Sequence, residues 1–237
     1  MTVAVILAGG VGNRLNAPVP KQFIKVGEKP VIVYTLEKFN VNPDIDAIVV
    51  PCLEPYVEEV KSYREKYGIE KLLRVIPGGE TFLDSCRVAA DAIADICGKG
   101  DIYIMHMAVA PMVDDEVISD CVQVAKEKGN AFSADPSYKC MCEMTSPGES
   151  SKYLDREIIF ALNTPQAFEY SKLMELFNSA GSIKEGLDYD PHLSTLYQLQ
   201  GETIYFSKGK ATNIKITTKE DLELFASYTK MEQHNRI

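Results

Sequence analysis

Hydrophobic and polar positions along the first half of the chain form short apolar runs that alternate with amphipathic stretches. Short apolar, β-branched runs predict strands buried on both faces, and apolar positions three and four residues apart predict helices that pack on a sheet. The pattern predicts strands at 3–7, 47–50, 72–76 and 102–105, another beginning at 131, and helices at 30–39, 56–67, 85–96 and 114–127. This alternation predicts a mainly parallel sheet with helices on both faces.

Residues 135–163 break the alternation. They contain short extended pieces, a turn signal at Pro147 and Gly148, and no helical periodicity. Their polar content predicts a hairpin arm that leaves the core. The arm also carries apolar residues, namely Met141, Ile158, Ile159 and Phe160. Because an extended apolar arm can pair with another chain, we expect it to join two copies in a homodimer.

The rest of the chain returns to regular elements. Helices are predicted at 170–178 and 192–198, a strand at 203–206 and a closing helix at 219–230. A length of 237 residues with 46% hydrophobic content suits one large domain and is short for two. We therefore expect a single Rossmann-like three-layer α/β domain over residues 1–237, with a mainly parallel mixed sheet and a protruding β-arm.

Charge and apolar content exclude several classes of partner. The net charge of -9 argues against nucleic acid or an anionic membrane as the main partner. No apolar stretch approaches the roughly 20 residues that span a bilayer, and the N-terminus lacks the pattern of a signal peptide, so we expect a cytoplasmic protein. The six cysteines are spread through ordinary predicted elements, which indicates reduced core thiols, and Cys140-Met141-Cys142 lacks a second ligand pair for a metal.

A glycine loop follows the first predicted strand directly. Gly9, Gly10 and Gly12 allow tight turns whose N–H groups can point at an anion, and Arg14 and Lys21 add full positive charge. Together they predict a polyphosphate site, and a nucleoside triphosphate in particular. A tight glycine turn with two solvated cations is the default interpretation of the glycines alone. The two cations, in the run that ends Pro20-Lys21-Gln22-Phe23, lower the weight of that alternative.

Two better-known glycine loops do not fit. The dinucleotide fingerprint needs a third glycine and a helix, but Leu15 stands at the third position, and Pro18 and Pro20 disfavour a helix. A Walker A loop needs lysine followed by serine or threonine, whereas Lys21 follows a proline and precedes Gln22. The loop therefore belongs to another class of phosphate site.

Four ordered segments resemble the cytidylyltransferase family that includes the methylerythritol-phosphate and ribitol-phosphate cytidylyltransferases. They are Leu7-Ala8-Gly9-Gly10 through Pro20-Lys21-Gln22-Phe23, Gly78-Gly79-Glu80 with Asp84-Ser85, Thr164-Pro165-Gln166 with Phe168, and Asn213 to Thr217 with Asp221-Leu222. The resemblance covers nearly the full length. The stretch Tyr205 to Gly209 is more similar to the ribitol-phosphate members, which occur with surface-polysaccharide synthesis, than to the isoprenoid enzymes.

The resemblance implies the substrates and the residues that hold them. It implies transfer of CMP from CTP to a phosphorylated polyol, with pyrophosphate as leaving group and Mg²⁺ bound mainly through the nucleotide phosphates rather than by protein ligands. The implied catalytic residues are Arg14, Lys21 and Lys215, and the implied nucleotide-binding residues are Ala8, Gly9, Gly10, Gly12, Gly79, Glu80 and Ser85. Arg156 in the arm is the implied acceptor-binding residue, reaching the site of a neighbouring subunit.

The chain departs from the family pattern on the acceptor side. The family usually has His-Asp-Ala-x-Arg-Pro where this chain reads His106-Met107-Ala108-Val109-Ala110-Pro111. Both charged positions are therefore lost, at Met107 and Ala110. Phe82 stands where the family has an arginine, and Lys139-Cys140 stands in the arm where it commonly has Asp-Thr. Candidate compensating residues are Lys139, Asp188, Asp190 and His192.

These departures leave three hypotheses open. The first is an active cytidylyltransferase for ribitol 5-phosphate or an acceptor like 2-C-methyl-D-erythritol 4-phosphate. The second is a weak or inactive CTP-binding paralogue, and the third is a sugar-phosphate nucleotidyltransferase that uses another nucleoside triphosphate. His106 is interpreted as a hydrogen-bonded strand-end residue rather than a general base, and Asp188 to Asp190 as an N-cap or an acceptor contact.

Overall fold

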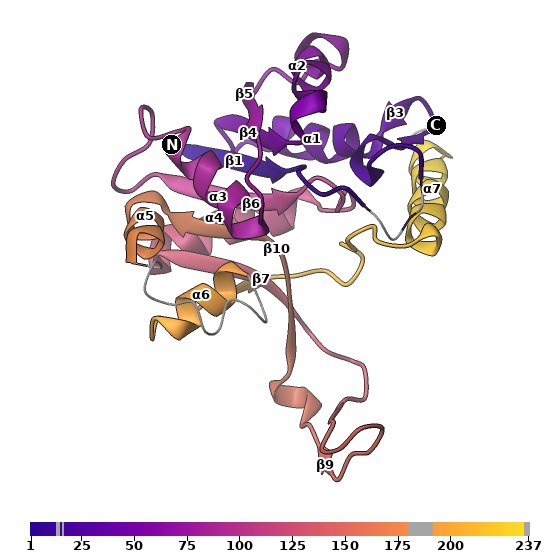
Figure 1. Ribbon diagram of the computed structural model, residues 1–237, viewed down its shortest axis with the longest axis vertical. Coiled ribbons are helices and arrows are strands. Elements are labelled where there is room, and N and C mark those ends of the chain that lie inside the picture. Colours follow the sequence, from indigo (N-terminus) through magenta and orange to yellow (C-terminus); the bar gives the residue numbers. More distant parts are fainter. Residues whose placement is uncertain (13–14, 16, 180–191, 235–237) are drawn as a thin grey trace.

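The computed structural model describes residues 1–12, 15, 17–179 and 192–234. Within them, seven strands form one sheet in the order β11-β7-β10-β6-β1-β4-β5 (Figure 1). Their bounds are β1 Thr2–Leu7, β4 Ala47–Cys52, β5 Leu72–Pro77, β6 Ile102–Met107, β7 Asn130–Pro136, β10 Phe160–Glu169 and β11 Phe206–Lys208. β10 runs antiparallel to β6 and β7, and the other pairs are parallel, so the predicted mainly parallel mixed sheet is confirmed.

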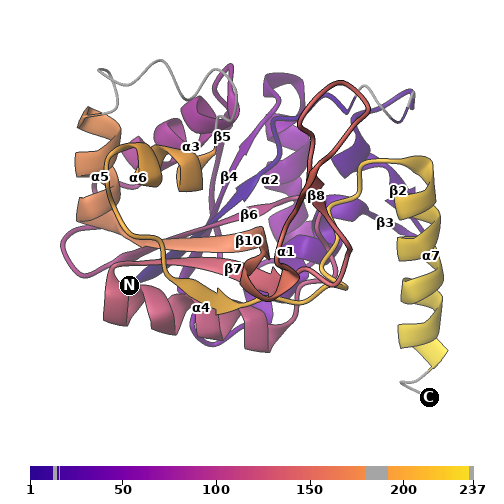
Figure 2. The ribbon, with the colours of Figure 1, turned by 90° about the horizontal axis from the view of Figure 1, so that it is seen from below.

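Helices cover both faces of this sheet, as the alternating pattern predicts. On one face, α1 (Val31–Val41), α2 (Val57–Lys66) and α4 (Asp115–Lys128) pack against side chains such as Ala4 and Ile6. On the other face, α3 (Phe82–Asp91), α5 (Tyr170–Ser179) and α6 (Leu193–Leu199) pack against Val3 and Val5 (Figure 2). Because successive strand side chains point to opposite faces, every residue of β1 is buried.

Two of the predicted elements begin three residues away from their expected starts. The helix expected at 85–96 begins earlier, at Phe82, because Thr81 and Asp84 form a reciprocal capping box before it. It ends at Asp91, and residues 93–97 continue as hydrogen-bonded turns instead. The strand expected at 203–206 lies at Phe206–Lys208, where Phe206 pairs with Phe132 of β7.

The sequence pattern misses β10 as a strand of the sheet. Its first residues fall inside the predicted arm, and Pro165 at its centre argues against a central strand. The structure accommodates the proline at a register irregularity between Leu162 and Gln166. A small hairpin, β2 (Lys25–Val26) with β3 (Lys29–Pro30), and a 3-10 turn at Lys21–Phe23 are also absent from the prediction.

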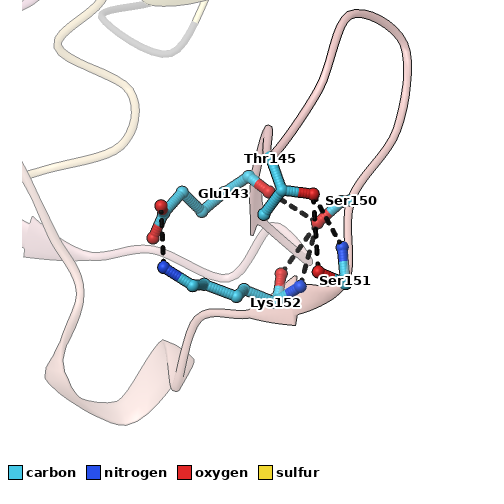
Figure 3. A network of polar contacts seen from close by, with 5 residues as sticks. All are labelled: Glu143, Thr145, Ser150, Ser151 and Lys152. Carbon is cyan, nitrogen blue, oxygen red and sulfur yellow. Dashed lines mark hydrogen bonds and ion pairs between the residues drawn. The ribbon is translucent and has the colours of Figure 1, made fainter.

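The predicted arm connects β7 to β10 and extends away from the layered body (Figure 1). It carries β8 (Cys142–Glu143), β9 (Lys152–Tyr153) and a 3-10 turn at Arg156–Ile158. Polar contacts hold its tip: Lys152 Nζ lies 3.1 Å from Glu143 Oε1, and Ser150 Oγ donates to the Glu143 carbonyl at 2.6 Å (Figure 3). No residue in 136–163, a range the structure describes in full, is buried, so the arm has no core of its own.

Four of the six cysteines lie in the core as expected, namely Cys52, Cys86, Cys97 and Cys121. Cys140 and Cys142 are instead exposed on the arm, and all six are free. The expectation of core thiols is therefore wrong for this pair, because the arm has no interior in which to bury them.

The C-terminal helix α7 (Lys219–His234) packs beside the glycine loop. Its Phe225 is buried with Val31 of α1, Met112 and Ile216, which attaches the C-terminal segment to the end of the sheet where the loop lies. None of the described helices is long and apolar enough to cross a membrane.

Candidate active site

A cavity of about 420 Å³ opens where β1, β5 and β6 end. Every described residue that the sequence implicates in nucleotide or phosphate binding lines it: Ala8, Gly9, Gly10, Gly12, Lys21, Gly79, Glu80, Ser85 and Lys215. Arg14 lies outside the described residues. The carboxyl ends of parallel strands meet at one edge of a sheet, which brings Leu7 and Met107 together here. The segment of Lys215 joins them because the Ile216 N–H donates to the Val109 carbonyl.

Gln22 holds the glycine loop in place. It is 1% exposed, and its Nε2 donates to the carbonyl of Ala8 at 2.7 Å and to that of Gly10 at 2.9 Å. Within the described part of the chain, the backbone N–H groups of Gly9 to Gly12 make no hydrogen bond. Gln22 therefore satisfies two carbonyls of the loop, and the N–H donors of the loop are available for an anion. This role of Gln22 is not predicted from the sequence, although Gln22 lies in the family-like segment Pro20-Lys21-Gln22-Phe23.

The second glycine segment packs tightly on the start of α3. A Cβ on Gly79 would lie 2.6 Å from the Asp84 carbonyl carbon and 2.8 Å from the Ser85 nitrogen, so only glycine fits. Ser85 Oγ accepts the Gly79 N–H at 3.1 Å and lies 3.6 Å from the Cβ position of Gly9. Ser85 thus stands between the two glycine loops and sets their separation.

The two lysines come together through backbone contacts. Lys21 Nζ donates to the carbonyl of Ile216 at 2.8 Å, next to Lys215, and the Ile216 N–H donates to the Val109 carbonyl at 2.8 Å. Gly12 has a φ of 73°, and its Cβ position lies 3.1 Å from Lys21 Cγ. A larger residue at Gly12 would therefore be strained and would press on Lys21.

Asp221 organises the segment after Lys215. Its carboxylate accepts the backbone N–H groups of Thr217 and Thr218, each at 2.8 Å. Burial raises the pKa of Asp221, but these hydrogen bonds and the nearby Lys21 charge outweigh it and hold the pKa below its usual value. A permanent negative charge therefore lies behind the cation pair at neutral pH.

Two of the altered positions line the cavity. Phe82, Met107 and Val109 line it, whereas Ala110 is fully buried. His192, a candidate compensating residue, packs edge-on against Phe82 with ring centroids 5.3 Å apart. Apolar and aromatic side chains therefore line the cavity where the family has charged residues, at Phe82 and Met107.

His106 occupies a structural position, as expected. It is fully buried, and its Nε2 lies 2.9 Å from the Ala110 carbonyl. Burial lowers the pKa of His106 to about 4, with the contact to Ala110 opposing it in part. The imidazole is thus neutral at physiological pH and lies behind the cavity wall.

The remaining predicted residues lie elsewhere. Arg156 and Lys139 are exposed on the arm and do not line the cavity, so a single chain does not bring them to the site. Asp188 and Asp190 lie outside the described residues, and α6 has His192 at its N-cap position.

The donor set determines how a metal ion could be held. No group of three or more His, Cys, Asp or Glu side chains suited to a metal occurs in the described chain. Glu80 is the one carboxylate among the described lining residues, beside Lys21 and Lys215. Such a cavity fits Mg²⁺ that arrives on polyphosphate oxygens, because a site with one carboxylate leaves most of its coordination to the ligand.

Known proteins are similar to this chain over nearly its whole length. The family model for 2-C-methyl-D-erythritol 4-phosphate cytidylyltransferase (IspD) matches residues 2–230. A ribitol-5-phosphate cytidylyltransferase of Lacticaseibacillus paracasei is 36% identical, covering 98% of this chain and 100% of the relative. A 2-C-methyl-D-erythritol 4-phosphate cytidylyltransferase of Clostridium botulinum is 30% identical over 93% of each chain.

Solved structures share the same fold. 4-Diphosphocytidyl-2C-methyl-D-erythritol synthase of Anaerococcus prevotii superimposes with a TM-score of 0.79 at 21% identity, covering 97% of this chain and 98% of that one. The Francisella tularensis 2-C-methyl-D-erythritol 4-phosphate cytidylyltransferase gives a TM-score of 0.74 at 26% identity, covering 96% and 98%. The fold described above is the fold of these enzymes.

Proposed function

Because the chain belongs to the 2-C-methyl-D-erythritol 4-phosphate cytidylyltransferase (IspD) family, we propose that it transfers CMP from CTP to ribitol 5-phosphate and releases pyrophosphate. The observation that carries the proposal is the convergence of both glycine loops, Lys21 and Lys215 on one cavity. The choice of acceptor rests on relatives named for ribitol 5-phosphate, which match at 36% and 32% identity over essentially the whole chain.

The donor half of the site supports CTP binding. The N–H groups of Gly9 to Gly12 face no other described acceptor and suit phosphate oxygens, and Ser85 and Glu80 offer hydrogen bonds to ribose and base. Lys21 and Lys215, with Arg14 from the same loop, neutralise the triphosphate. Mg²⁺ that enters with the nucleotide supplies further charge neutralisation of its phosphates.

The chemistry needs no protein nucleophile. An oxygen of the acceptor phosphate attacks the α-phosphorus in line, a new P–O bond forms, and the bond to pyrophosphate breaks with its electron pair on the leaving group. The residues position the substrates and stabilise charge. Negative charge grows on the phosphate oxygens in the transition state, and Lys21 and Lys215 stabilise that charge. A site dominated by cations is what this reaction requires.

The acceptor half is completed, in this proposal, by a second copy of the chain. Arg156 lies on the exposed arm, far from its own cavity lining, and the arm carries exposed apolar side chains such as Tyr153 and Ile158. A dimer formed through the arm would bury them and bring Arg156 to the partner's acceptor phosphate. We place the reaction in the cytoplasm, where CTP is available.

A substrate panel tests the acceptor. The purified chain is incubated with CTP and Mg²⁺ and with ribitol 5-phosphate or 2-C-methyl-D-erythritol 4-phosphate, and pyrophosphate and the CDP-alcohol are measured. We expect a higher kcat/KM with ribitol 5-phosphate. Turnover with the methylerythritol compound alone would overturn the acceptor assignment, and UTP or GTP as a better donor would overturn CTP.

Phe82, Met107 and Ala110 favour the second candidate function, a CTP-binding paralogue with feeble turnover. Loss of a charged group from a phosphoryl-transfer site costs several kcal/mol of transition-state stabilisation, roughly a hundredfold or more in rate. Calorimetry that shows CTP binding, combined with no pyrophosphate release for any acceptor at high protein concentration, would favour this alternative over the enzyme.

A further inference from the structure

A second cavity lies at the end of the sheet opposite the candidate active site. Its volume is about 610 Å³, and it lies between the end of α4, the helices α5 and α6, and the segment 199–205. It includes Asn130, the first residue of β7, whereas the glycine loop follows the last residue of the similarly oriented β1. About one strand length, roughly 20 Å, therefore separates the two cavities, and none of their described lining residues is shared.

One lining residue of this cavity, Tyr197, carries a buried hydroxyl group. Tyr197 is 4% exposed, and its ring is fixed by stacking on Phe168, with centroids 5.3 Å apart, and by an edge contact with Phe132 at 6.0 Å. Its hydroxyl has no hydrogen-bond partner in the described part of the chain. Burial and the charges of Glu202 and Glu169 raise the pKa of Tyr197, so the hydroxyl stays protonated. A rigid, unsatisfied donor at a cavity wall is costly unless something in the cavity accepts from it.

Lys128 and Lys172 line the same cavity. Lys172 Nζ is 2.6 Å from the position that a Cβ on Gly129 would take, and Lys128 Nζ lies 5.9 Å from the ring centroid of Tyr205. Among the described residues, neither ammonium forms an ion pair. Lys172 near the C-terminus of α4 also stabilises the helix dipole. The helix dipole accounts for the position of Lys172, but it does not account for the unpaired hydroxyl of Tyr197.

The rest of the wall offers hydrogen-bond acceptors. Glu175 and Glu202 line the cavity, and Gln200 bridges α5 and α6, with its Nε2 donating to the Leu176 carbonyl at 3.3 Å. Two carboxylates would repel a bare anion but accept from hydroxyl groups. The cavity is also far larger than one phosphate needs. Two cations with a fixed donor, followed by acceptors, match a phosphate attached to a hydroxylated carbon chain.

We propose that this second cavity binds a small polyol or sugar phosphate, with Lys128 and Lys172 at the phosphate, the Tyr197 hydroxyl donating to a phosphate oxygen, and Glu175 and Glu202 accepting from hydroxyl groups. The site is separate from the candidate active site. It can therefore be occupied whether or not the chain turns over CTP.

Backbone amide signals distinguish the two sites in one titration. The full-length chain, labelled with ¹⁵N, is titrated with glycerol 3-phosphate, and the shifts of Gly129 and Gly201 report the second cavity while those of Gly9 and Gly79 report the active site. We expect saturable shifts at Gly129 and Gly201. Their absence overturns the proposal, whether or not the signals of Gly9 and Gly79 shift.

Variants test the contacts. Tyr197→Phe keeps the packing and should weaken binding about tenfold, the typical loss for a hydrogen bond to a charged group, and Lys172→Met should weaken it at least as much. Lys126→Met removes a charge from the same turn of α4 outside the cavity lining and should leave binding unchanged. Wild-type affinity in both Tyr197→Phe and Lys172→Met would overturn the proposal.

Two further ligands test the chemical class. Glycerol alone lacks the phosphate, and inorganic phosphate lacks the hydroxylated chain. We expect both compounds to bind at least tenfold more weakly than glycerol 3-phosphate, as measured from the amide signals of Gly129 and Gly201. Equal affinity for inorganic phosphate would overturn the polyol phosphate class in favour of a simple anion site, and equal affinity for glycerol would overturn the role of the lysines.

Discussion

Lys21 connects the two segments that carry the positive charge of the candidate active site. It follows the glycine loop in sequence, and its ammonium donates to the carbonyl of Ile216, beside Lys215, at 2.8 Å. One side chain thus positions both cations relative to the loop donors. If the chain catalyses the proposed reaction, whose transition state accumulates charge on phosphate oxygens, we expect Lys21 to contribute to rate as well as to binding.

Replacement of Lys21 by alanine should therefore lower kcat by about 100-fold or more, the usual loss when a preorganised charge contact to a transition state is removed. Pyrophosphate release at saturating CTP measures the change. Lys25→Ala is a matched control, because Lys25 is exposed on β2 close by and does not line the cavity. Unchanged kcat in Lys21→Ala would contradict the role given to this lysine.

His106 makes stability depend on pH. Its folded-state pKa of about 4 lies below the ordinary value of 6.5, so the unfolded chain binds a proton that the folded chain excludes. The stabilising contribution of the neutral, buried ring is present above pH 6.5 and is lost as the pH falls toward 4.

Between pH 7 and pH 5, the titration of His106 should lower the free energy of unfolding by about 2 kcal/mol. His106→Gln keeps an amide donor for the Ala110 carbonyl and does not titrate, so its melting temperature should fall less steeply over that range. Thermal unfolding of both proteins at several pH values checks this. Parallel pH profiles would show that His106 does not titrate as described.

At the scale of elements, α3 begins directly after the second glycine segment, Gly78-Gly79-Glu80. Thr81 Oγ1 accepts the Asp84 N–H at 3.1 Å, and Asp84 Oδ2 accepts the Thr81 N–H at 3.0 Å. This capping box fixes the first turn of α3, and with it Ser85 against Gly79. Helix stability and loop geometry are therefore coupled at this point.

Loss of this cap should be measurable. Thr81→Ala should cost about 1 kcal/mol, which lowers the melting temperature of a chain of this size by about 2–4 °C. Ser62→Ala removes an exposed hydroxyl from α2 and should change stability by less than about 0.5 kcal/mol. An equal shift in both variants would argue against a capping contribution.

Strand β10 is the strand of the sheet that the local sequence pattern does not predict. Pro165 cannot donate to a ladder, and the residues before it resemble the polar arm, so the local pattern argues against a strand. In the folded chain, Gln166 to Glu169 pair with β6, and Phe160 to Leu162 pair with β7 beyond the irregularity. Partners 24 to 67 residues away stabilise the strand, from Pro136 opposite Phe160 to Ile102 opposite Glu169, and no local window contains them.

At the scale of the whole molecule, the arm has no stable environment within one chain. Its residues are exposed, and Tyr153, Met144 and Ile158 present apolar surface to solvent. A second copy that covers this surface would account for it and would complete the acceptor side with Arg156. The proposed function thus predicts a dimer.

Ile158→Glu tests the dimer. Ile158 is 74% exposed in one chain, so a charge there should be harmless to the monomer but should weaken a dimer formed through the arm at least tenfold. Sedimentation over a range of concentrations measures the change. Val41→Glu, an exposed position on α1, is the control and should stay dimeric. A wild-type chain that is a strict monomer at high concentration would contradict the proposal.

The sequence alone determined the alternating architecture and the family, and it predicted the phosphate loop, because buried strands, amphipathic helices and glycine turns are local consequences of residue type. It also placed Lys215 with Lys21, through a resemblance in motif order. Only the tertiary structure decided that Gln22 binds the carbonyls of Ala8 and Gly10, that the altered positions Phe82 and Met107 line the same cavity, and that Tyr197 lines a second cavity. These depend on side chains brought together across the sheet, and such contacts are set by the packing of distant segments rather than by any local pattern.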